Sequence, residues 1–325
     1  MSIMKISIAL ATYNGTRYLR EQLDSFVTQS RSPDELVITD DNSTDDTISI
    51  IKSFAKQAPF EIRYSVNEKN IGYTANFERA IQQCTGDLIF LSDQDDVWLP
   101  KKIARIEAEF EQNPAFLLIM CDARLVYADG SQTQFTNLNQ TIALGLTDHQ
   151  FATGCCMAFR RTLMPLLLPI PTDKFKHDEW INQLAILLNG RHIIPEVMQY
   201  YRRHSNNTSE WLANSIGKFN QYDLYQSYHN KDPRRFYFNR LKQIQKLEQR
   251  LQNIINYDPD FVKFSGKIEN ALKILQLERL AVKARIKVMN RPRWRRLPHV
   301  LTAWASGHYR FFQGWKSALI DLIRV

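Results

Sequence analysis

The sequence lacks the long apolar run, roughly 18 residues, that a membrane-spanning helix needs. Its mean hydropathy is −0.37, and the apolar N-terminal stretch 6–13 is shorter than the core of a convincing signal peptide. Glycine and proline are scarce, with 11 and 12 residues in 325, which excludes collagen-like and low-complexity chains. We therefore expect a soluble globular chain that is not exported.

Cysteine is also scarce. The four thiols, Cys84, Cys121, Cys155 and Cys156, show no paired CxxC spacing with histidines nearby. This pattern excludes a disulfide framework and gives no zinc-site signature. Buried thiols of this kind are typical of a reducing compartment. We expect the protein to work in the cytoplasm.

Two phosphate-binding signatures are missing as well. The chain has no P-loop and no GxGxxG motif after an apolar strand. Those glycine-rich turns are what ATPases and dinucleotide-dependent dehydrogenases use to hold phosphates. The absence disfavours both classes of enzyme.

Charge is distributed unevenly along the chain. Residues 1–200 hold 18 Lys and Arg against 25 Asp and Glu, a net charge of −7, whereas residues 201–325 hold 24 against 9, a net charge of +15. The acidic part argues against a protein built throughout to grip nucleic acid, so we expect no nucleic-acid partner. The basic part suits an anionic surface such as a membrane leaflet.

Apolar strand patterns alternate with amphipathic helix patterns over the first 130 residues. Strands are expected at 5–11, 35–39, 61–66, 87–91 and 116–127. This order predicts an α/β fold with a mostly parallel sheet covered by helices, whose ligands bind beyond the carboxyl ends of the strands. The segment 129–150 is polar and poorly periodic, so we expect a loop there.

From about residue 211 the pattern is helical. Two apolar stripes, 241–255 and 264–279, are joined by a turn at 257–260, which predicts an antiparallel helical hairpin. We predict one domain over 1–210 and a helical C-terminal region over 211–325. The terminal segment has apolar residues at helical spacing and follows an arginine cluster; these are Phe312, Trp315, Leu319, Leu322, Arg291, Arg293, Arg295 and Arg296. Two interpretations stay open: a helix buried against the hairpin, or an amphipathic helix on an anionic leaflet.

Four polar clusters follow predicted strands or open a later helix: 12–14, 40–43, 93–96 and 177–180. The third cluster, Asp93-Gln94-Asp95-Asp96, is the most informative, because three carboxylates within four residues repel one another unless a cation compensates them. Hard oxygen ligands at a strand end suit Mg²⁺ or Mn²⁺. The chemistry indicated is a metal–diphosphate clamp for a leaving nucleoside diphosphate.

Four segments carry a family resemblance: IALATYN at 8–14, DDNSTD at 40–45, NIG at 70–72 and DQDDVW at 93–98. Together they resemble family 2 glycosyltransferases of the GT-A fold, and within that family the rhamnosyltransferase-like enzymes of bacterial surface polysaccharide assembly. The resemblance covers roughly residues 4–208. It implies inverting, metal-dependent transfer of rhamnose or another hexose from a UDP- or dTDP-sugar to a glycan or lipid-linked oligosaccharide of O-antigen or capsule. It is compatible with a place at the inner face of the plasma membrane.

The resemblance also implies roles for individual residues on the donor side. Thr12, Tyr13 and Asn14 would line the nucleotide pocket. The other positions expected near the donor are Asp41 at the base, Asn70, Gly72 and Asn76 in a loop and helix start, Asp93 at the ribose, Gly154 on a strand beside the sugar, and Arg202 in a late segment. A glycine allows close approach of a ligand to the backbone.

The metal would be held by Asp95, with Asp93 and His204 beside it. Asp178 matches the catalytic base, but the adjacent Glu179 leaves the base open between the two, because successive residues of a helix point about 100° apart. Trp180 is either an acceptor platform or a core residue.

Two other functions remain open. A sugar-nucleotide nucleotidyltransferase also uses carboxylate-bound metal, but it is expected to show a glycine-rich, basic loop near the first strand, and 12–20 offers only Gly15, Arg17 and Arg20. A non-catalytic nucleotide-sugar or membrane-binding module would not need both Asp95 and Asp178.

Overall fold

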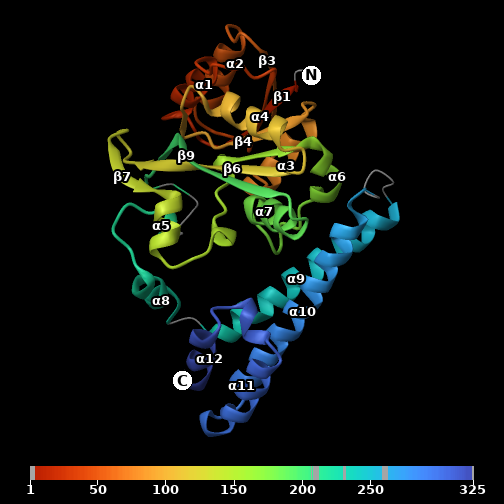
Figure 1. Cartoon of the computed structure of the whole chain (residues 1–325). Coiled ribbons are helices and arrows are strands. Elements are labelled where there is room, and N and C mark those ends of the chain that lie inside the picture. The colour runs from red at the N-terminus through yellow and green to blue at the C-terminus, as the bar shows by residue number, and fades with distance from the viewer. Residues whose placement is uncertain (1–3, 206, 208–211, 230–231, 258–262, 324–325) are drawn as a thin grey trace. The chain divides into compact units, whose positions relative to one another are not determined.

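The computed structural model (Figure 1) describes residues 4–205, 207, 212–229, 232–257 and 263–323. The chain forms two compact units, Met1–Ser227 and Tyr228–Val325. Helix α8 (Gln221–His229) begins in the first unit, where its Leu224 packs with Leu144 and Ala213. The domain boundary predicted at 210 stays a prediction.

The first unit alternates strands and helices. Its strands are β1 (Ile6–Thr12), β2 (Glu35–Asp40), β3 (Glu61–Val66), β4 (Leu88–Ser92), β5 (Val97–Trp98), β6 (Leu118–Val126), β7 (Gln132–Thr136), β8 (Met157–Arg160) and β9 (Arg191–Arg202). Its helices before α8 are α1 (Leu19–Val27), α2 (Thr47–Ala55), α3 (Tyr73–Gln83), α4 (Lys102–Gln112), α5 (Asn137–Ala143), α6 (Met164–Leu167) and α7 (His177–Leu187).

The strands form one sheet in the order β3-β2-β1-β4-β8-β6-β9-β5, with β7 paired to β6. β3, β2, β1 and β4 are mutually parallel, and so are β6 and β9. β8 runs antiparallel between β4 and β6. The expected α/β fold is therefore confirmed, and the carboxyl ends of β1, β2 and β4 meet at one edge.

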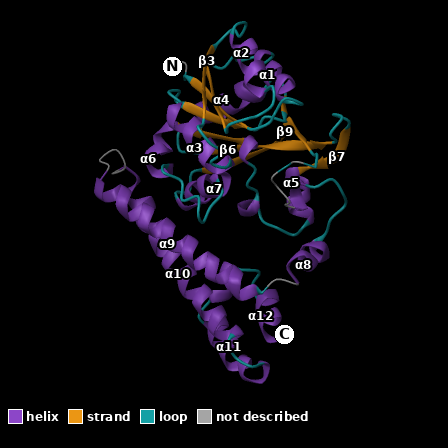
Figure 2. Ribbon diagram, turned by 180° about the vertical axis from the view of Figure 1, so that it is seen from behind, coloured by secondary structure: helices purple, strands orange, loops and turns teal. Residues whose placement is uncertain are grey.

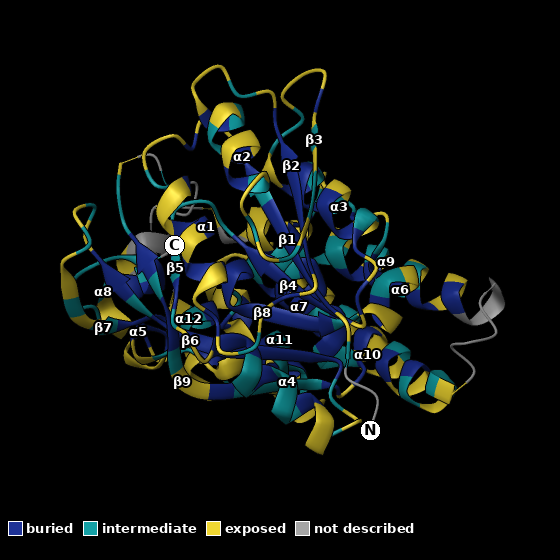
Figure 3. Ribbon diagram, turned by 90° about the horizontal axis from the view of Figure 1, so that it is seen from above, coloured by how far each residue is buried: buried dark blue, intermediate teal, exposed yellow. Residues whose placement is uncertain are grey.

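The core of this unit follows from the apolar spacing. Alternate residues of β1, Ile6, Ile8 and Leu10, share a buried cluster with the inward faces of α1, α2 and α4. Figure 3 shows the central strands buried and the connecting loops exposed. Burying these side chains at about 25 cal/mol per Å² is what fixes the strand ends in place.

The segment expected to be a loop, 129–150, contains β7 and α5 instead. β7 pairs antiparallel with the end of β6, and its burial alternates between exposed and partly buried residues. Thr136 caps α5 by accepting a hydrogen bond from the Asn139 N–H at 3.2 Å. A short edge strand of polar residues lacks the apolar alternation on which the expectation was based.

The second unit is helical, with α9 (Pro233–Tyr257), α10 (Ser265–Met289), α11 (Arg296–Ala305) and α12 (Trp315–Ile323). α9 and α10 pack side by side along their length (Figure 2), which confirms the predicted hairpin. Their inward residues, among them Ile244, Leu247, Leu251, Ile268 and Leu275, are buried. The predicted turn at 257–260 lies mostly outside the described residues. Among the described helices, none combines the length and apolarity required to cross a bilayer.

Candidate active site

The loop after β1 is tied to the loop after β2. Thr12 is buried, and its hydroxyl donates to Asp40 Oδ2 at 2.7 Å. Asn14 has a positive φ of 47°; its N–H donates to Ser43 Oγ at 2.8 Å, and its Oδ1 accepts from the Thr44 N–H at 2.9 Å. Thr12 and Asn14 therefore hold the loops after β1 and β2 together, and their place in a nucleotide pocket stays a prediction.

The loop after β1 is also tied to the acidic loop after β4. The Gln94 side chain accepts from the Tyr13 N–H at 2.8 Å and donates to the Tyr13 carbonyl at 2.9 Å. A Cβ at Gly15 would collide with Gln94 Oε1, so a larger residue there would displace the Gln94 side chain. The Tyr13 ring itself is 46% exposed, which leaves an aromatic face available to a flat ligand.

Asp41 holds the segment before α3. Its Oδ1 accepts from the Ile71 N–H at 2.8 Å and from Asn67 Nδ2 at 2.8 Å, and its Oδ2 accepts from the Gly72 N–H at 2.9 Å. Gly72 has φ of 86°, a conformation that favours glycine, and Asn70 Oδ1 also accepts from its N–H at 3.2 Å. These predicted residues do lie together, beside the end of β2.

Asn76 and Arg202 are both buried in the framework. Asn76 Nδ2 donates to the carbonyl oxygens of Thr39, at 2.8 Å, and Thr12, at 3.3 Å. Arg202 donates to Glu21 Oε2 at 2.5 Å and to the Asp95 carbonyl at 3.1 Å. Their side chains thus position the ends of β1 and β2 and the acidic loop. Contact of either side chain with the donor stays a prediction.

The acidic loop crowds negative charge. Ligand atoms of Asp93, Asp96 and Cys155 lie within 4.8 Å of one another. Burial, and then the nearby charges of Asp95 and Asp178, raise the pKa of Asp93 to about 7. Burial and the charges of Asp95 and Asp93 raise the pKa of Asp96 well above its usual range. Such crowding is relieved by a bound cation.

Asp95 meets His204 across the site. His204 Nε2 lies 2.8 Å from Asp95 Oδ2, and the imidazole stacks on Tyr18 with ring centroids 5.1 Å apart. Asn207 Nδ2 donates to the same Asp95 oxygen at 3.2 Å. A carboxylate and an imidazole suit Mn²⁺ or Mg²⁺, so the pair Asp95 and His204 fits part of the metal site that the sequence predicts. Among the described residues, the donor atoms that come within 4.8 Å of one another are those of Asp93, Asp96 and Cys155, so the ligand set Asp93, Asp95 and His204 stays a prediction.

The beginning of α7 brings the expected base to this cluster. A Cβ at Gly154 would lie 2.6 Å from His177 Nε2 and 3.5 Å from the Asp178 Cβ, so glycine lets α7 approach this closely. The charge of Asp178 contributes to the raised pKa of Asp93, and its role as the base stays a prediction. Glu179 is half-buried beside Asp178 and stays the second candidate.

Trp180 is a core residue. Its side chain is 1% exposed, its Nε1 donates to the Leu167 carbonyl at 2.8 Å, and its ring lies 4.9 Å from that of Phe175. The prediction of Trp180 as an acceptor platform is therefore wrong, because the ring points into the helix packing and not toward the site.

Sequence reasoning missed a buried cation below the acidic loop. Lys102 is fully buried; its Nζ donates to the Cys155 carbonyl at 2.7 Å and to Gln199 Oε1, and it lies 3.8 Å from the centre of the Trp98 ring. Gln199 Nε2 in turn donates to Asp96 Oδ2 at 3.1 Å. The arrangement forms a relay from Lys102 through Gln199 to Asp96. A lysine on a helix with no motif around it gives no local sequence signal of this role.

Comparisons with known proteins agree with this geometry. The model of a family described as glycosyl transferase family 2 matches residues 7–165. An uncharacterized glycosyltransferase of Nostoc sp. (strain PCC 7120) is 30% identical over 227 residues, which are 66% of this chain and 70% of that protein. An uncharacterized protein of Mycobacterium tuberculosis is 30% identical over 207 residues, and the match spans 62% of this chain but only 59% of that relative's length. A dTDP-rhamnosyl transferase of Shigella flexneri is 39% identical over 99 residues, 29% of this chain and 34% of that protein.

Two solved structures share the architecture. Staphylococcus aureus TarS in complex with UDP has a TM-score of 0.52 at 18% identity, covering 97% of this chain and 92% of that chain. A mannosyltransferase from Pyrobaculum calidifontis, in complex with GDP-Man and Mn²⁺, has a TM-score of 0.51 at 17% identity, covering 100% and 86%. At these identities the likeness shows the fold alone, which is of the GT-A type. With the family match and the Nostoc relative, it follows that the chain belongs to glycosyl transferase family 2 and is a glycosyltransferase.

Proposed function

We propose that this enzyme transfers a sugar, rhamnose or another hexose, from a nucleoside diphosphate sugar to a hydroxyl of a glycan or lipid-linked oligosaccharide, with inversion. The observation that carries the proposal is that α7 begins beside the acidic loop: Cys155 Sγ lies within 4.8 Å of carboxylate oxygens of Asp93 and Asp96, and a Cβ at the preceding Gly154 would lie 3.5 Å from the Asp178 Cβ. This supports a cation site and a base close to each other, as such a displacement requires.

The reaction follows from these positions. Asp178 takes the proton of the acceptor hydroxyl while the oxygen attacks the anomeric carbon. The new bond joins that carbon to the acceptor oxygen; the bond to the diphosphate breaks, and its electron pair leaves with the nucleoside diphosphate. A divalent cation held by Asp93, Asp95 and His204 would neutralise the charge that develops on the leaving diphosphate. Inversion results because base and leaving group act on opposite faces of the sugar.

The donor side is proposed from the residues around the β1 and β2 loops. Tyr13 offers an exposed ring for the base. Within the described part of the chain, Asp41 Oδ2 accepts one hydrogen bond, from the Gly72 N–H, which leaves it room to accept another. The Shigella relative named as a dTDP-rhamnosyl transferase supports a dTDP-sugar, whereas TarS was solved with UDP-GlcNAc, which supports UDP-sugars. We propose cytoplasmic action in bacterial O-antigen or capsule assembly, where such donors and lipid-linked acceptors meet.

Thermal denaturation with a panel of UDP-, dTDP- and GDP-sugars, with and without Mn²⁺, tests the proposal. A donor at 100 times its dissociation constant adds about 2.7 kcal/mol, which corresponds to roughly 5–10 °C for a unit of this size. Asp95→Ala should lose the part of the shift that needs Mn²⁺. Asp24→Ala should keep it, because it removes a surface carboxylate whose ion pair, among the described residues, is with Arg20.

Two results would contradict the proposal. One is full Mn²⁺-dependent stabilisation in Asp95→Ala. The other is formation of pyrophosphate from a nucleoside triphosphate and a sugar 1-phosphate, which would identify a nucleotidyltransferase instead.

A further inference from the structure

The outer faces of α11 and α12 are apolar, whereas helices that pack only against their own chain normally expose polar residues. In α12 the inward residues are Ser317, Ala318 and Asp321, all buried. The outward residues are the large apolar ones: Trp315 is 62% exposed, Leu319 48% and Ile323 61%. A helix folded for its own unit alone places large apolar side chains inward. The predicted stripe is therefore divided: Phe312 contacts Tyr237 of α9 and Leu322 packs against the small core of this unit, whereas Trp315 and Leu319 are exposed.

Residues 294–304, which include most of α11, show the same pattern as α12, with large apolar side chains facing outward. The inward residues Val300 and Ala303 join Val288, Tyr309 and Ala318 in a small core. The outward row is Trp294, Leu297, Leu301 and Trp304, with exposures of 75%, 53%, 58% and 49%. Spacings of three and four residues put this row on one face. Both rows are exposed and apolar, and we refer to them jointly as the outer apolar face: Trp294, Leu297, Leu301, Trp304, Trp315, Leu319 and Ile323.

The charges around this face have one sign. Residues 279–320 contain ten Lys and Arg and no Asp or Glu. The exposed Arg291, Arg293 and Arg295 lie directly before α11, and Arg295 stacks over the Trp294 ring at 4.1 Å. An apolar face flanked by cations complements a surface that is apolar within and anionic at its edge.

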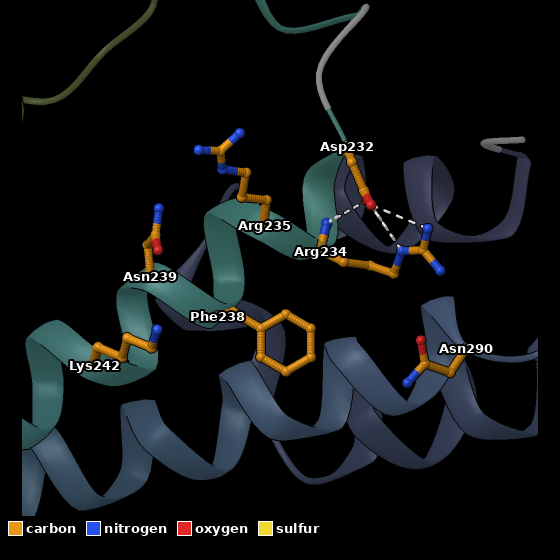
Figure 4. A pocket seen from close by; sticks show the side chains of 7 residues that line it. All are labelled: Asp232, Arg234, Arg235, Phe238, Asn239, Lys242 and Asn290. Atoms are coloured by element: carbon orange, nitrogen blue, oxygen red, sulfur yellow. Dashed lines mark hydrogen bonds and ion pairs between the residues drawn. The ribbon is translucent and has the colours of Figure 1, made fainter.

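A basic hollow in the same unit extends this charge (Figure 4). It lies between the start of α9 and the end of α10, and it is lined by Asp232, Arg234, Arg235, Phe238, Asn239, Lys242 and Asn290. Asp232 is its single carboxylate and pairs with Arg234 at 3.0 Å. Asn290, which lines the hollow, directly precedes Arg291 in the sequence, so the hollow borders the start of the arginine segment.

We infer that the outer apolar face docks on an anionic lipid bilayer, lying in the headgroup region without spanning it. Tryptophan is the side chain that favours this depth, and arginines reach phosphates from it. A nucleic acid would use the arginines but would leave Leu301, Leu319 and Ile323 in water. The inference rests on the second unit alone and does not depend on the donor or on catalysis.

Co-sedimentation with vesicles tests it, using the full chain. Wild-type protein should bind vesicles of phosphatidylcholine with one third phosphatidylglycerol and stay in the supernatant with phosphatidylcholine alone. Binding should weaken roughly tenfold at high salt, because exposed charges are screened. The triple variant Arg291→Ser, Arg293→Ser and Arg295→Ser should bind about 100-fold more weakly, at about 1 kcal/mol for each cation.

Truncating the apolar row separates a bilayer from other polyanions. Trp294→Ser with Leu301→Ser should reduce vesicle binding, whereas Ile142→Ser, an equally exposed apolar residue of α5 at 62%, should leave it unchanged. Transfer to a short soluble acceptor should be the same in all these variants. Unchanged melting temperatures would show that each variant is folded.

Three outcomes would overturn the inference. The wild-type chain stays in the supernatant with both vesicle types. A duplex oligonucleotide is bound more tightly than vesicles, with no effect of the Trp294 and Leu301 substitutions. Light scattering without lipid shows a dimer that the same substitutions convert to monomer, which would make this face a contact between two copies.

Discussion

At the scale of single residues, the site depends on carboxylates that are held close together. Asp93 lies where the charges of Asp95 and Asp178 both reach it, and Asp96 is buried below them. The protein offsets part of this repulsion with Lys102, whose charge lowers the pKa of Asp93. The remaining repulsion would favour a bound cation at this cluster. The crowded carboxylates and the buried lysine that partly compensates them therefore belong to one cluster.

Asp178→Asn should lower turnover by roughly 10²–10⁴-fold, because the amide keeps the shape of the carboxylate but cannot accept the proton. Donor binding should change little, since binding does not require the base, and a thermal shift with the donor and Mn²⁺ measures this. Glu179→Gln is the matched control, with near-normal turnover expected. If Glu179→Gln shows the loss and Asp178→Asn does not, the base is Glu179.

Lys102→Met should destabilise the metal-free protein increasingly as pH rises. Burial raises the pKa of Asp93 to about 7, so its contribution to stability is present at low pH and is lost as pH rises toward 7. Without the positive charge of Lys102, the pKa of Asp93 is higher still, so the loss of stability extends to higher pH. Urea unfolding at pH 5, 7 and 8.5 in EDTA measures the difference.

Lys101→Met is the control for this prediction, because Lys101 is exposed on the same turn. It should show a small effect that does not vary with pH. A Lys102→Met effect that is equally large at pH 5 and pH 8.5 would mean that the lysine contributes hydrogen bonds and packing only.

At the scale of elements, one buried carboxylate joins several strands near their start. Glu35, at the beginning of β2, accepts from Ser7 Oγ at 2.5 Å, from the Thr85 N–H at 2.6 Å and from Arg63 at 2.6 Å. It therefore links β1, β2, β3 and the segment before β4. Burial alone would raise its pKa, but these hydrogen bonds lower it to about 2.

Glu35→Gln should destabilise the protein by about 2–3 kcal/mol at pH 7, as expected for a carboxyl pKa lowered from 4.5 to about 2. For a lowered pKa, the contribution is present above pH 4.5 and is lost as pH falls toward 2. The gap between variant and wild type in urea unfolding should therefore close with acidification. Glu61→Gln, at an exposed position of β3, should show little effect; a gap that stays constant with pH would contradict the argument.

The elements also show how far sequence reasoning reaches. Apolar spacing predicted the parallel strands and their helices, because burial sets that spacing, and the rule that ligands bind at strand ends found Asp41, Asp93 and Asp95. Apolar spacing did not predict β7 and α5, because polar residues dominate this segment. β7 forms instead by pairing with β6. Sequence reasoning also missed the relay from Lys102 to Gln199, because 97 residues separate the two positions, and no local pattern reports such a contact.

At the scale of the whole molecule, each of the two units has its own core. The first has the cluster built around β1, α1, α2 and α4. The second has the hairpin and the small core of α10, α11 and α12. In the second unit a buried ion pair fastens α12 to α10: Arg285 donates to Asp321 at 2.6 and 2.8 Å, and Tyr309 donates to the same carboxylate at 3.0 Å. Separate cores predict separate unfolding transitions.

Calorimetry of the full chain should then resolve two transitions that respond to different changes. Asp321→Asn leaves Arg285 buried without its counter-charge, a defect that typically costs about 3–5 kcal/mol, so it should lower one transition. A donor with Mn²⁺ should raise the other transition alone, because the residues of the candidate site all belong to the first unit. The Asp321→Asn variant should show the same donor-dependent shift as wild type. If one transition moves with both changes, the two units unfold as one, and the independence of their cores is wrong.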